Sequence, residues 1–104
     1  MVYLVTILPV EDYEQWIADL ESSAETLAAI GVTRHWVFRA TDDHKEVMNV
    51  FELPSADHAK RMLQSPELDI PGWLDRTGLE IYPTFFLGEQ TGFKEYPPAA
   101  DGNA

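Results

Sequence analysis

The spacing of hydrophobic residues changes between segments of the chain. Residues 2–8 form a nearly continuous apolar run that Pro9 ends, which is typical of a strand covered on both faces. From Glu11 to Ile30 the spacing is helical, and at about 100° per residue the apolar side chains fall within an arc of roughly 120°. This arc contains Tyr13, Trp16, Ile17, Leu20, Ala24, Leu27 and Ala28. We therefore predict a central first strand and then one long amphipathic helix, which Gly31 ends.

Two further strands are predicted as a hairpin. Residues 32–40 and 46–53 are rich in β-branched and aromatic side chains, and the five residues between them are polar. Ser55 is a typical helix N-cap and predicts a short second helix. Residues 65–74 predict a broken helix, because Pro71-Gly72 interrupts them.

Residues 79–87 predict a fourth strand, and Pro83 within it favours a sheet edge or a bulge. The resulting order β-α-β-β-α-β is the ferredoxin-like α+β pattern, a four-stranded antiparallel sheet with helices on one face. We expect one domain over residues 1–93 and a flexible tail over residues 94–104.

Both faces of the predicted strands are apolar. In the second strand, for example, Trp36 and Phe38 point to one face of the sheet and Val37 points to the other. The helices can cover only one face of the sheet, and an exposed apolar sheet face is larger than the patches that monomers of this size usually carry. We therefore predict a homodimer in which two sheets face each other across a two-fold axis, a dimeric α+β barrel.

Charge and composition restrict the partners of this domain. Seven basic and eighteen acidic residues give a net charge of −11, which repels phosphate backbones and anionic lipid headgroups, so we expect no nucleic acid and no membrane partner. The chain has no cysteine, which excludes disulfides and thiolate zinc sites. The apolar start is too short to span a bilayer and lacks a basic leading segment, so a cytoplasmic location is expected.

Three polar strand residues are candidates for catalysis. His35 could act as a general base or as a haem-type ligand because its ordinary pKa lies near neutrality, or it could simply be a hydrogen-bonded residue of an outer strand. Asn49 is unusual in a central strand and could hold a carbonyl group or water, although buried amides also fix packing. Tyr82 would need a partner for its hydroxyl group if buried.

The aromatic strand residues predict a pocket for a small apolar or aromatic ligand, either between sheet and helices or between two facing sheets. Core packing is the alternative explanation for them, and for Arg34 it is a solvent-exposed ion pair. The predicted ligand-pocket residues are Arg34, Trp36, Phe38, Phe51 and Phe86, with Phe85 as a further aromatic. The acidic turn at residues 42–46 is interpreted as solvated, and neither a metal site nor a cofactor is predicted.

Between about Thr6 and Leu87 the chain resembles the dimeric α+β barrel proteins, and among them the antibiotic biosynthesis monooxygenase-like proteins. The resemblance rests on Val10-x-Asp12-Tyr13-x-x-Trp16, Gly31-Val32, Arg39 with Asp42-Asp43, Glu46-Val47, Phe51-Glu52, Ala59, Ser65-Pro66-Glu67-Leu68 and Gly78-Leu79 ahead of Pro83. The sequence departs from the family at Pro71-Gly72-Trp73 and at Ile81-Tyr82. The resemblance implies the fold and the dimer, and many proteins of this kind have no assigned chemistry.

Three functions are compatible with these features. The first is an enzyme that oxidises or cyclises a small aromatic molecule without a cofactor. The second is a binding module for an apolar ligand or haem, without turnover. The third is a structural dimer whose interior is filled by its own side chains.

Overall fold

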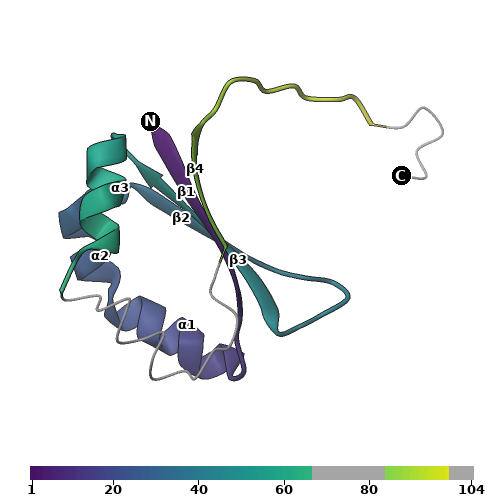
Figure 1. The fold of residues 1–104 in the computed structure, drawn as a ribbon. Helices are drawn as coiled ribbons and strands as arrows, with labels where there is room; N and C mark the ends of the chain where they lie inside the picture. Colours follow the sequence, from purple (N-terminus) through teal and green to yellow (C-terminus); the bar gives the residue numbers. More distant parts are fainter. Residues whose placement is uncertain (67–83, 99–104) are drawn as a thin grey trace.

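The computed structural model describes residues 1–66 and 84–98, and within them four strands form one antiparallel sheet. The elements are β1 (Val2–Pro9), α1 (Tyr13–Ser22), α2 (Ala24–Ile30), β2 (Arg34–Arg39), β3 (Glu46–Leu53), α3 (Ala56–Leu63) and β4 (Thr84–Glu89). The strand order is β2-β3-β1-β4, and the helices lie on one side of the sheet (Figure 1). This arrangement confirms the predicted ferredoxin-like α+β fold and the central position of the first strand.

The two central strands pair along their whole length. Leu4 of β1 lies opposite Phe51 of β3, and Thr6 lies opposite Asn49. The bounds of β3 are those predicted from the sequence. β4 continues two residues beyond its predicted end, while residues 79–83 and most of the predicted broken helix lie outside the described residues.

The helix predicted over residues 11–30 differs from the structure, because it is divided at Ser23 into α1 and α2. α1 begins after Asp12, whose carboxylate accepts the backbone N–H three residues further on at 3.1 Å. The hydroxyl groups of Ser22 and Ser23 donate to the carbonyl oxygen of Asp19 at 2.7 and 3.0 Å. Such side-chain bonds compete with the helical backbone bonds and are a known cause of helix bending.

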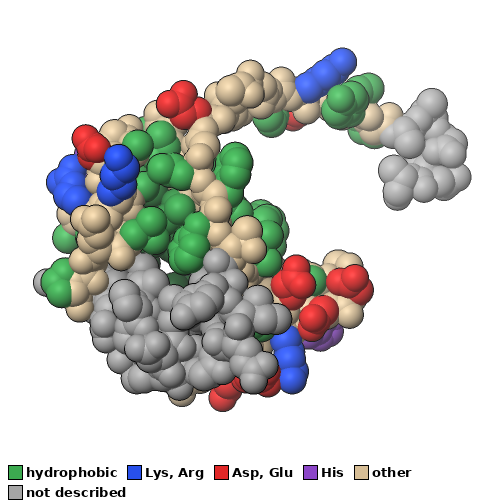
Figure 2. All heavy atoms as spheres, in the orientation of Figure 1, with side chains coloured by type: hydrophobic (Ala, Val, Ile, Leu, Met, Phe, Trp, Pro, Cys, Tyr) green, Lys and Arg blue, Asp and Glu red, His purple; other side chains and the backbone are tan. Residues whose placement is uncertain are grey.

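One face of the sheet packs against the helices and forms the core. Two clusters fill it: Val2, Leu4, Leu27, Phe51, Leu53, Ala59 and Met62, and then Leu8, Val10 and Val47. Figure 2 shows the hydrophobic side chains gathered between the helices and β4, while acidic side chains surround the β2–β3 turn. The contrast between these regions follows from burying apolar surface and leaving charge in water.

The opposite face of the sheet, which we call the open face, is also apolar. It carries Tyr3, Val5, Ile7, Trp36, Phe38, Met48, Val50 and Phe86. Ile7, Phe38 and Phe86 are 36%, 49% and 62% exposed. Apolar residues on both faces, as predicted from the sequence, are therefore present within the described strands.

Two further features of the fold are the course of the chain beyond β4 and the length of the helices. Residues 90–98 contain no helix or strand and extend away from the sheet in Figure 1. None of the helices in the described ranges is long and apolar enough to cross a membrane.

Candidate functional site

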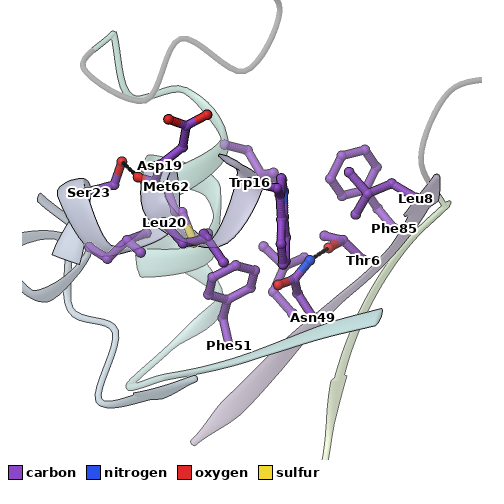
Figure 3. Close-up of a pocket in the computed structure, with 13 residues that line it drawn as sticks. Thr6, Leu8, Trp16, Asp19, Leu20, Ser23, Asn49, Phe51, Met62 and Phe85 are labelled. Atoms are coloured by element: carbon purple, nitrogen blue, oxygen red, sulfur yellow. Dashed lines mark hydrogen bonds between the residues drawn. The ribbon is translucent and has the colours of Figure 1, made fainter. Parts of the chain in front are cut away.

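A pocket of about 180 Å³ lies between the sheet and the helices (Figure 3). The sheet contributes Leu4, Thr6, Leu8, Asn49, Phe51 and Phe85, and the helices contribute Trp16, Asp19, Leu20, Ser23, Leu27, Met62 and Leu63. Most of these side chains are apolar. The pocket is thus a hydrophobic space with a few polar groups, which is the usual composition of a small-molecule site.

The floor of the pocket is polar where the two central strands meet. Because Thr6 and Asn49 lie opposite each other in the register, their side chains point to the same face of the sheet. Asn49 Nδ2 donates to Thr6 Oγ1 at 3.2 Å, and Asn49 is only 3% exposed. A buried amide with fixed partners can present its remaining donor to a ligand.

His35 holds the other end of this amide from the neighbouring strand β2. Its Nε2 donates to Asn49 Oδ1 at 2.9 Å, and its ring stacks on Phe51 with ring centres 4.1 Å apart. Burial lowers the pKa of His35 below its ordinary value, although the hydrogen bond to Asn49 acts in the opposite direction. His35 itself faces a groove between β2 and the helices α1 and α2, so it reaches the pocket through Asn49.

The helical side of the pocket depends on the break between α1 and α2. Trp16 extends from α1 toward Asn49 in Figure 3, and Asp19 and Ser23 border the pocket near the break. Asp19 accepts a hydrogen bond from the Gln15 side chain at 3.0 Å. Among the described lining residues, Asp19 is the one with a titratable side chain, and it is exposed.

The structure brings together three of the eight residues singled out from the sequence. His35, Asn49 and Phe51 are in mutual contact on the helix-covered face. The other predicted ligand residues, Arg34, Trp36, Phe38 and Phe86, lie on the open face, and the first three border a shallow groove there. Tyr82 lies outside the described residues.

Most of the lining residues were not singled out as site residues, and three of them, Trp16, Asp19 and Thr6, differ in the signal that the sequence offers. Trp16 was assigned to the core because it falls on the apolar arc of the first helix, and Asp19 resembles any other acid of a solvated helix face. Thr6 could have been found from its place opposite Asn49, but this requires the strand register, which the sequence pattern alone does not provide.

The open face carries an ion pair in which the Glu52 carboxylate is buried and the Arg34 side chain is largely exposed. Glu52, which is 4% exposed, accepts hydrogen bonds from Arg34 Nη2 at 2.6 Å, Thr33 Oγ1 at 2.7 Å and Tyr3 Oη at 2.9 Å. These donors, the Arg34 guanidinium first, lower the pKa of Glu52 to about 2. The Arg34 guanidinium also lies 5.1 Å from the centre of the Trp36 ring. Arg34 is thus committed to a structural ion pair.

The described ranges, 1–66 and 84–98, contain no group of three or more histidine, cysteine, aspartate or glutamate residues placed to hold an ion. The acidic turn between β2 and β3 instead closes on itself, because Asp43 Oδ1 accepts the backbone N–H of Lys45 at 3.0 Å.

No family model and no curated protein sequence matches the chain. Solved structures do match it. A variant of SnoaB, a cofactor-independent oxygenase from Streptomyces nogalater, has a TM-score of 0.60 at 21% identity, over 88% of this chain and 94% of that one. A putative antibiotic biosynthesis monooxygenase from Deinococcus radiodurans has a TM-score of 0.65 at 11% identity, over 93% of this chain and 99% of that one.

A dimeric ferredoxin-like protein from an uncultured marine organism also matches, with a TM-score of 0.59 at 14% identity, over 92% of this chain and 100% of that one. At these identities the likeness concerns the fold. It agrees with the resemblance found in the sequence, and the chain therefore has the ferredoxin-like fold that these structures share.

Proposed function

We propose that this protein is a cofactor-independent oxygenase that oxidises a small aromatic molecule in the pocket between the sheet and the helices. The observation that carries the proposal is the amide of Asn49, which is buried at the floor of an apolar pocket and held there by His35 and Thr6. A cytoplasmic location, expected from the sequence, is part of the same proposal.

The size of the pocket favours a ligand site over a filled interior. An apolar cavity of about 150 Å³ is large enough to bind benzene. The pocket of about 180 Å³ therefore leaves room for an aromatic ring beside the Asn49 amide. This space argues against the third function considered from the sequence, a purely structural dimer.

The reaction we propose needs molecular oxygen and an electron-rich phenol or enol. The hydroxyl group loses its proton to solvent, and a ring carbon of the resulting anion forms a bond to one atom of O₂. The O–O bond then breaks, and the distal oxygen leaves as water with two protons, one of them from the C–H bond of the attacked carbon. For a phenol the balance is C₆H₅OH + O₂ → C₆H₄O₂ + H₂O.

In this scheme Asn49 is the catalytic residue, because its amide N–H donates to the substrate oxygen on which negative charge develops. Donors of this kind are worth most in an apolar site that excludes water. Trp16 and Phe51 supply flat walls against which an aromatic ring can pack.

The test is oxygen incorporation from ¹⁸O₂, followed by mass spectrometry, with hydroxyquinol, 1-naphthol and anthrone as probes. We expect the wild-type protein to place one ¹⁸O atom in the product. Asn49→Leu should lower kcat/KM by about 100-fold, the usual effect of removing one such donor. Gln90→Leu, an exposed amide beyond β4, is the matched control and should keep its activity.

Two results would decide against the enzyme. Probe binding without ¹⁸O incorporation above the protein-free rate would favour the alternative function, a binding module. Equal activity in Asn49→Leu and wild type would remove the amide from the mechanism.

We further propose that the protein forms a homodimer through its open face. The support is the apolar character of that face, on which Phe38 and Phe86 are 49% and 62% exposed. A second copy would cover these side chains, and a ligand between two facing sheets would then contact Arg34, Trp36, Phe38 and Phe86.

A further inference from the structure

The Asn49 amide is held at both ends, and this determines what it can offer to a ligand. A carbonyl oxygen only accepts hydrogen bonds, so the contact between His35 Nε2 and Asn49 Oδ1 at 2.9 Å requires a proton on Nε2. The amide nitrogen then points toward β1, where one of its two hydrogens reaches Thr6 at 3.2 Å. Within residues 1–66 and 84–98 the second N–H of Asn49 has no partner, and it can serve a ligand in the pocket.

His35 is well placed to fix this orientation. Its ring is stacked on Phe51 with an angle of 18° between the ring planes, and burial lowers its pKa. Burial thus favours the neutral imidazole, and the contact with Asn49 Oδ1 places its proton on Nε2. Without that donor, the Asn49 amide could rotate by 180° and present its oxygen to other groups.

The dimensions and charge of the pocket limit the ligand that this N–H can receive. A cavity of roughly 150 Å³ accepts benzene. The pocket of about 180 Å³ therefore has additional room for only a small substituent on the ring. Asp19 borders the pocket on a chain of net charge −11, which disfavours carboxylate or phosphate substituents.

We propose that the pocket binds an uncharged single-ring phenol whose oxygen accepts the second N–H of Asn49, and that His35 is a positioning residue which sets the direction of this amide. The inference rests on the pocket of the proposed oxygenase and names its substrate class. It assigns to His35 a role through Asn49 instead of the general-base role considered from the sequence.

The experiment compares the binding of phenol and toluene, two molecules of nearly the same shape that differ in the hydrogen-bonding group. Affinities are measured by calorimetry for wild type, Asn49→Leu, His35→Leu and His35→Gln. Losing one neutral hydrogen bond should lower the phenol-to-toluene affinity ratio by about three- to tenfold in both leucine variants. His35→Gln keeps an N–H donor near the position of Nε2 and should keep the ratio.

Toluene affinity is the control for an intact pocket: it should be the same in wild type and in both His35 variants, and Asn49→Leu should still bind toluene. A second readout needs no variant: phenol, but not toluene, should shift the side-chain amide ¹⁵N signal of Asn49 in the wild-type protein. An unchanged ratio in His35→Leu, or loss of the ratio in His35→Gln, would contradict the positioning role. An unchanged ratio in Asn49→Leu would contradict the phenol site.

The results also separate this inference from the proposed function. If phenol binds as expected while no probe acquires ¹⁸O, the oxygenase proposal fails and the phenol site stands. If 1-naphthol or anthrone is oxygenated while phenol has no advantage over toluene, the oxygenase stands and the single-ring assignment fails.

Discussion

Glu52 lies buried on the open face, where a carboxylate alone would be strongly unfavourable. Its two oxygens are shared among Arg34, Thr33 and Tyr3, so each charge and polar group in this cluster has a partner. Tyr3 belongs to β1, Arg34 belongs to β2, and Thr33 directly precedes β2. Glu52 belongs to β3, which lies between β1 and β2 in the sheet. One residue therefore connects three neighbouring strands at one end of the sheet.

The cluster predicts a pH-dependent stability. The pKa of Glu52 is about 2 in the folded protein, below its ordinary value of 4.5, so its carboxylate stabilises the fold above about pH 4.5. This contribution is lost as the pH falls from there toward 2. Glu52→Gln should therefore melt at a lower temperature than wild type at pH 7, and the difference should shrink on acidification to pH 3. Melting curves followed by circular dichroism measure it.

Glu46→Gln, an exposed position on the same strand, is the matched control for this experiment. Its melting temperature should stay close to that of wild type at neutral pH, because exposed charges contribute little. A difference between wild type and Glu52→Gln that stays constant between pH 7 and pH 3 would contradict the role assigned to the ion pair.

At the scale of elements, the strands were easier to predict than the long helix. β3 follows its pattern to the residue, because β-branched and aromatic residues and a polar turn mark it clearly. The helix break at Ser23 was not predicted, since the apolar spacing continues through it and only the two serine hydroxyls compete for the Asp19 carbonyl oxygen.

For the candidate site, individual residues could be predicted from the sequence, but the contacts between them could not. Asn49 could be singled out because an amide is rare in a central strand, and His35 and Phe51 because of their chemistry. Their mutual contacts depend on the register of three strands and on side-chain packing. Neither is encoded in the periodicity of one segment, so the pairing of Asn49 with Thr6 and the position of Arg34 on the other face emerge only in the folded chain.

The end of α2 provides a prediction for a single element. Gly31 has φ = +121°, and a Cβ atom there would lie 2.7 Å from Cδ2 of His58. Gly31→Ala should therefore lower the free energy of unfolding by about 1–3 kcal/mol, measured by urea denaturation. Gly92→Ala is the control, because nothing lies within 4 Å of its added Cβ, and it should leave the stability unchanged.

A double variant separates the two causes of this strain. His58→Ala in the Gly31→Ala background removes the close contact but not the unfavourable φ, so it should restore only part of the stability. Equal stability of Gly31→Ala and wild type would show that the left-handed conformation is not required at this position.

For the whole molecule, the open face and the charge act in opposite directions. Aromatic and aliphatic side chains on the sheet favour covering this face with a second copy, and burial of such surface stabilises association. A net charge of −11 on each copy repels the other one. Salt screens that repulsion and leaves the apolar contribution, so the proposed dimer should tighten as ionic strength rises.

This balance gives the final prediction, which light scattering and analytical ultracentrifugation measure. Wild type should have twice the mass of one chain at micromolar concentration. The dissociation constant of the dimer should decrease when the NaCl concentration is raised from 20 mM to 500 mM. Phe86→Arg places a charge on the open face and should produce monomers, because an unpaired buried charge is strongly unfavourable in an interface. Tyr96→Arg changes a more exposed aromatic residue beyond β4 and should remain dimeric. A monomeric wild type in 500 mM NaCl would refute the dimer, because charge repulsion is then screened and the apolar face alone has failed to hold two copies together.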